Sequence, residues 1–62
     1  LTTQDVLGDL GEHHRSVLTL RYVDDLPVAE VARLIDRTLH ATEALLVRAR
    51  RAFRTRYEEV TR

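Results

Sequence analysis

The stretch VARLIDRTLHATEALL, Val31 to Leu46, contains two apolar runs separated by the polar break Asp36-Arg37-Thr38. Asp and Thr side chains compete with the backbone for hydrogen bonds, so they favour caps and turns over helix interiors. One unbroken helix over residues 28–60 is therefore disfavoured. The stretch predicts a sharp corner between two helices.

The segment after the break has the features of a long amphipathic helix. Thr38 is a good N-cap residue. Apolar and small residues then recur at steps of three or four, as expected for one inward-facing stripe: Leu39, Thr42, Leu46, Ala49, Phe53, Tyr57 and Val60.

The segment before the break predicts a shorter helix. Pro27 fits the first helical turn, and the inner stripe would be Val28, Val31, Ala32 and Ile35. The small side chain of Ala32 would let the two helices approach, with Val31, Ile35 and Leu45 packed inside the corner. Asp36 takes a turn position where Gly is common, since Asp tolerates the left-handed conformation. Residues 28–53 thus predict a helix-turn-helix, a unit whose second helix can enter a DNA major groove. An ordinary helical hairpin is the alternative.

Two further helices are expected upstream. Thr2 and Asp5 have the spacing of a capping box, and Gly8 and Gly11 would weaken and end that first helix. A second amphipathic helix is expected over His13–Val23, with Asp24 and Asp25 following as a loop. The predicted fold class is all-α, a four-helix domain over residues 1–62 with a C-terminal helix-turn-helix.

Length and composition exclude several classes of function. A chain of 62 residues forms one domain with little room for a catalytic cleft, and no nucleophile with a base is apparent, so no enzyme and no cofactor are predicted. The absence of Cys favours a reducing cytoplasm. No apolar run approaches a membrane span, and the adjacent His13 and His14 point about 100° apart on a helix and do not suggest a metal site. The first residue, Leu1, suggests a fragment of a longer chain with further domains upstream.

Charge is distributed unevenly along a chain of zero net charge. Residues 1–36 carry seven acidic residues and three arginines, a net charge of −4, whereas residues 45–62 carry six arginines and two glutamates, a net charge of +4. This asymmetry is typical of a chain with one end that faces a polyanion. All ten basic residues are Arg, which suits contact with phosphate or guanine, although a high-GC coding bias gives the same preference.

Several short motifs occur together between His14 and Phe53. They are Arg15-Ser16-Val17-Leu18, Leu20-Arg21-Tyr22, the run from Leu26 to Ala32, and Arg48-Ala49-Arg50-Arg51-Ala52. In this order and spacing, the chain resembles region 4 of a bacterial sigma factor of the extracytoplasmic-function group. The resemblance implies a four-helix domain that recognises the −35 element of promoters while bound to RNA polymerase, on the flap of its β subunit.

The resemblance also implies which residues face DNA. The recognition helix would begin at Thr38, whose side chain and neighbouring backbone N–H groups would meet a phosphate. Arg48 and Arg51 would carry positive charge to the DNA backbone or to a guanine edge. The complete expected DNA-facing set is Arg37, Thr38, His40, Ala41, Glu43, Ala44, Val47, Arg48 and Arg51.

Two residues depart from the family's usual recognition helix. Glu43 stands where members often have a basic residue, and Leu45 where many have Arg, so fewer phosphate contacts and weaker DNA binding are expected. Glu43 either accepts a hydrogen bond from a cytosine amino group or is a solvated neighbour of Arg50. His40 either donates to a base or phosphate or is simply an exposed first-turn residue.

The alternative function is a helical protein-interaction module without direct DNA readout. Apolar residues of the first two helices, Leu7, Leu10, Val17 and Leu18, would then form a surface for RNA polymerase or for an anti-sigma factor. The two roles are compatible within one domain.

Overall fold

Helices make up most of the computed structural model, which describes residues 3–8 and 10–61. In chain order these are α1 (Thr3–Gly8), α2 (Glu12–Leu18), the π-helical segment η1 (Thr19–Val23), α3 (Val28–Leu34) and α4 (Leu39–Thr61). No strand occurs within the described ranges. The predicted all-α class is therefore confirmed.

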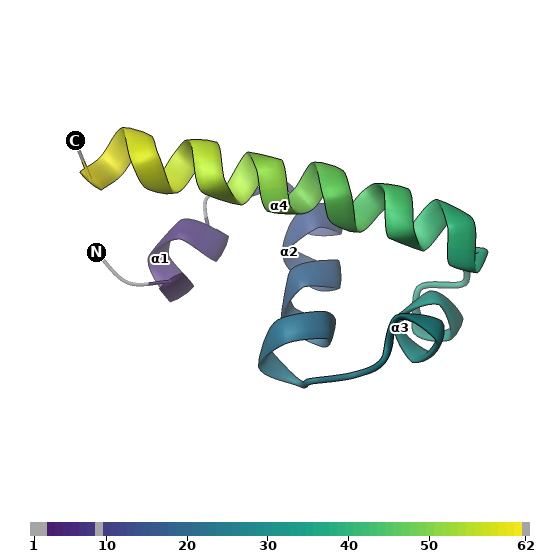
Figure 1. Ribbon diagram of the computed structural model, residues 1–62. Coiled ribbons are helices and arrows are strands. Elements are labelled where there is room, and N and C mark those ends of the chain that lie inside the picture. The colour runs from purple at the N-terminus through teal and green to yellow at the C-terminus, as the bar shows by residue number, and fades with distance from the viewer. Residues whose placement is uncertain (1–2, 9, 62) are drawn as a thin grey trace.

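Helix α4 spans the length of the molecule, and the shorter helices lie along one side of it (Figure 1). Its 23 residues rise about 34 Å at 1.5 Å per residue, close to the longest dimension of the molecule, 36 Å. Helix α1 lies beside the C-terminal half of α4, α2 beside its middle and α3 beside its N-terminal end. The fold thus supports α4 from one side only.

The hydrophobic core lies between α4 and the shorter helices. Its buried residues are Leu7, Val17, Leu18, Val31, Leu45, Leu46 and Ala49. Thr42 is also fully buried, and its hydroxyl donates to the Thr38 carbonyl at 2.8 Å, which avoids the penalty for an unpaired buried polar group. The middle of the predicted stripe on α4 is confirmed.

The prediction that the stripe faces inward along its whole length is wrong at its two ends. Leu39 is 50% exposed and Tyr57 41% exposed, and the side chain of Val60 lies outside the described residues. At about 100° per residue, Leu39 and Tyr57 lie roughly 60° to 80° around the helix from the line through Thr42 and Ala49. They therefore sit at the edge of the buried stripe.

The first two helices depart from prediction in detail. The expected capping residue Thr2 lies outside the described residues. Gly8 ends α1, and Gly11 is the extended N-cap residue of α2 (φ −60°, ψ 155°). The single helix expected over His13–Val23 changes after Leu18 into a π-helical turn, in which the Asp24 N–H donates to the Thr19 carbonyl at 2.9 Å.

The prediction that apolar residues of these two helices form an exposed surface is also wrong. Leu7, Val17 and Leu18 are at most 5% exposed, and Leu10 is partly buried against the core. A chain of this size must bury such residues to fold. None of the described helices is both long and apolar enough to cross a membrane.

Candidate nucleic-acid interface

The corner between α3 and α4 is a Schellman motif. The Arg37 N–H donates to the Ala32 carbonyl at 3.0 Å, and the Asp36 N–H to the Arg33 carbonyl at 3.3 Å. Asp36 has φ 57°, the left-handed conformation that this helix ending requires. The prediction of a left-handed turn residue at Asp36 is confirmed.

Thr38 caps the first turn of α4. Its Oγ1 accepts from the Ala41 N–H at 3.0 Å, and its carbonyl accepts from the Thr42 N–H at 2.9 Å. The predicted N-cap is therefore confirmed. Helix geometry leaves the N–H groups of Leu39 and His40 without acceptors inside the helix, so two donors remain for an anion at this exposed end.

Packing inside the corner fixes the angle at which α4 leaves it. Val31, Ala32 and Leu45 are at most 6% exposed, and Ile35 packs partly buried against the core. The predicted helix-turn-helix packing is thus present. Pro27 lies one residue earlier than expected, at the N-cap of α3, where its carbonyl accepts from the Val31 N–H at 3.0 Å.

The expected DNA-facing residues of α4 share one side of that helix, here called the recognition face. His40, Ala44, Val47 and Arg51 follow one another at steps of three or four, which places them in a row. Across the helix lie the buried residues Thr42, Leu45, Leu46 and Ala49. The recognition face consists of His40, Ala41, Glu43, Ala44, Val47, Arg48 and Arg51, all exposed except the half-buried Ala41 and Ala44.

The charge at this face is net positive. Arg48 and Arg51 lie on it, Arg37 is exposed in the preceding turn, and Glu43 is its one acidic residue. Arg33 on α3 is different, because its guanidinium binds both carboxylate oxygens of Glu30, with Nε to Oε2 at 3.1 Å. This hydrogen bond lowers the pKa of Glu30 and raises the pKa of Arg33, so the Arg33 charge is already compensated.

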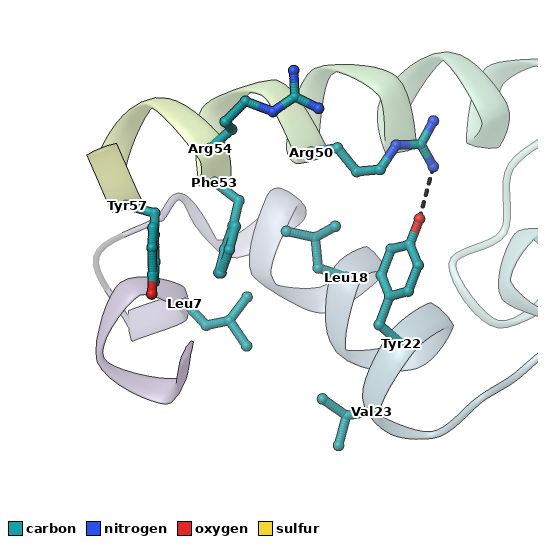
Figure 2. Close-up of a pocket in the computed structure, with 8 residues that line it drawn as sticks. All are labelled: Leu7, Leu18, Tyr22, Val23, Arg50, Phe53, Arg54 and Tyr57. Atoms are coloured by element: carbon teal, nitrogen blue, oxygen red, sulfur yellow. Dashed lines mark hydrogen bonds between the residues drawn. The ribbon is translucent and has the colours of Figure 1, made fainter. Parts of the chain in front are cut away.

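An apolar groove lies beside the C-terminal half of α4 (Figure 2). It encloses about 440 Å³ and is lined by Leu7, Leu18, Tyr22, Val23, Arg50, Phe53, Arg54 and Tyr57. Arg50 Nη1 donates to the Tyr22 hydroxyl at 2.8 Å and so joins α4 to η1. The rings of Phe53 and Tyr57 stack with their centroids 6.1 Å apart.

Sequence reasoning missed this groove. One signal was available: Arg50, Phe53 and Tyr57 recur at steps of three and four, which places them on one face of α4. The contribution of η1 was not available, because the π-helical turn that carries Tyr22 was unexpected. Among the residues that the structure describes, no three His, Cys, Asp or Glu side chains are grouped to hold a metal ion.

Comparison with known proteins gives the family. The model of the family described as Sigma-70, region 4, matches residues 2–53, from the first helix through the recognition face. No curated protein and no solved structure matches the chain significantly. The matched range covers most of the chain and includes the whole corner between α3 and α4. The chain therefore belongs to the sigma-70 region 4 family, a DNA-binding domain of transcription initiation factors.

Proposed function

We propose that the chain recognises the −35 element of promoters as region 4 of an extracytoplasmic-function sigma factor. One observation carries this proposal: α4 buries one side against the core and presents the recognition face on the other, directly after a capped corner. A helix held in this way can enter the major groove with its first turns against the base edges. Such a role belongs to the cytoplasm, where transcription takes place.

The proposed contacts follow from side-chain chemistry. Thr38 and the free N–H groups of the first turn would hold a phosphate, which sets the register of the helix. Arg48 and Arg51 would bind phosphate or a guanine edge, and Arg37 would add positive charge in the turn. His40 would donate to a base or phosphate, and Glu43 would accept from a cytosine amino group.

RNA polymerase is the second proposed partner, held at the apolar groove. Val23 and Tyr57 are exposed at the groove and Phe53 is half-buried in it. The groove faces a different side of α4 from the recognition face. One domain could therefore hold DNA and the β flap together. An anti-sigma factor that occupies the same groove would compete with the polymerase.

The roles of Arg48 and Glu43 can be tested by footprinting and transcription on a matched set of −35 variants. The full-length sigma factor is used with core polymerase. Arg48→Ala should weaken all promoters about equally if the arginine binds phosphate, or one base pair by about 1 to 3 kcal/mol if it reads guanine. Glu43→Gln should relax the preference at one position if Glu43 accepts from cytosine. Arg15→Ala, which removes an exposed arginine on α2, serves as the matched control.

The alternative, a protein-interaction module without DNA readout, is favoured by the groove alone. It predicts that Arg48→Ala and Glu43→Gln leave DNA affinity, promoter preference and transcript level unchanged. In that case, replacing Phe53 with Ala would still reduce binding to core polymerase. That combination of results would overturn the proposal of −35 recognition.

A further inference from the structure

The recognition face has an apolar centre between its charged residues. Val47 is 46% exposed, and Ala44, one helical turn before it, is half-buried at the same face. Val47 does not belong to the hydrophobic core cluster. The aliphatic side chain of Val47 is therefore accessible at the middle of the recognition face and is available to contact a partner there.

The chemistry of the major groove offers one apolar partner to such a side chain. Among the four bases, only thymine presents a methyl group at its major-groove edge, and aliphatic side chains make favourable contacts with it. Ala44 is small enough to let the helix backbone approach the base edges. The side chain of Val47 is larger than that of Ala44 by two methyl groups, and it has no polar atom that would require a hydrogen-bond partner.

We propose that Val47, supported by Ala44, reads a thymine methyl group within the −35 element. This inference rests on the proposed function. DNA fits the apolar centre better than a protein partner does, because Arg48 and Arg51 lie beside Val47 on the same face and Arg37 is exposed in the preceding turn. These positive charges complement the phosphates of DNA. Glu43 and His40, nearer the start of the helix, would discriminate neighbouring base pairs.

Deoxyuridine provides the test, since it differs from thymidine only by the missing methyl group. The full-length sigma factor with core polymerase first selects duplexes from a pool randomised across the −35 region. Each thymine of the selected element, in either strand, is then replaced singly by deoxyuridine, and the affinity is measured. One or two positions should lose affinity by about threefold to fivefold, the effect expected for one buried methyl group.

The protein side of the test uses two aliphatic substitutions of similar exposure. Val47→Ala should weaken the thymine duplex by a similar factor and should abolish the effect of deoxyuridine. The substitution should not harm folding, because Ala is the better helix former. Leu34→Ala removes a side chain that is 49% exposed on α3, outside the recognition face, and should leave the deoxyuridine effect intact.

The outcomes separate this inference from the function on which it rests. A selected element without thymine, deoxyuridine without effect at any position, or a deoxyuridine effect that persists in Val47→Ala would each overturn the role of Val47 and leave −35 recognition standing. A holoenzyme whose selection shows no sequence preference in this region would overturn both. Loss of the deoxyuridine effect in Val47→Ala alone, and not in Leu34→Ala, would support the assignment.

Discussion

At the scale of single residues, the backbone at Asp36 determines where α3 ends and in which direction α4 starts. Its φ of 57° lies in a region that costs most L-residues about 1 to 2 kcal/mol, although Asp and Asn reach it more readily than others. Gly is the usual residue at this position of a Schellman motif. Asp36 is therefore tolerated at this position, although Gly would adopt the same backbone conformation with less strain.

Substitution at Asp36 should show this directly. Asp36→Gly is expected to keep or raise the free energy of unfolding, by up to about 1 kcal/mol, because glycine adopts the left-handed region freely. Asp36→Val should lower it by about 1 to 2 kcal/mol, because a β-branched side chain is strained there. Urea unfolding followed by circular dichroism measures both. Equal stability of the two variants would show that residue 36 is not held at positive φ in solution.

At the scale of elements, local signals in the sequence predicted the corner between α3 and α4. The exposure of individual side chains and the groove depend on packing between residues far apart in the sequence. Thr38 favours an N-cap and Asp36 favours a turn because of the hydrogen bonds that their own side chains can make. The boundary between α3 and α4 could therefore be predicted without knowledge of the fold. The exposure of Leu39 depends on which side of α4 the core covers. The groove depends on a π-helical turn that periodicity does not encode. The DNA-facing residues were proposed from a family resemblance, and only their placement on one accessible face is visible in the fold.

Packing of α3 against α4 depends on a small residue at position 32. Ala32 is 5% exposed, so Ala32→Leu should overpack the corner and cost about 1 to 3 kcal/mol of stability, a large share of the total for a small domain. Ala29→Leu adds the same volume at an exposed site on α3 and should melt close to the parent. If Ala32→Leu melts like Ala29→Leu with unchanged helicity, the two helices do not meet at Ala32.

At the scale of the whole molecule, the separation of charge predicts modest, salt-dependent DNA binding. The acidic residues of the first 36 positions oppose a polyanion, whereas the arginines of α4 attract it. With about three to five phosphates neutralised, the log–log plot of affinity against salt concentration should have a slope of roughly −3 to −5. Titration of a labelled duplex at several salt concentrations measures this slope. Tight binding that does not change with salt would contradict the prediction.

Helix α4 is the element that connects the two proposed partners, since the recognition face and the apolar groove occupy different sides of it. Most of the recognition face lies before Arg50, and the part of α4 that lines the groove begins there. In this proposal, DNA would lie near the first turns of the helix and polymerase near Tyr57. Both partners would then be engaged without contact between them.

Site-specific crosslinking in the promoter-bound holoenzyme tests this central claim most directly. A benzoylphenylalanine in place of His40 should crosslink to DNA within the −35 element, because position 40 is exposed at the start of the recognition face. The same photoreactive residue in place of Tyr57, 41% exposed at the groove, should crosslink to a polymerase subunit and not to DNA. A holoenzyme that initiates transcription while position 40 gives no crosslink to DNA would contradict the account.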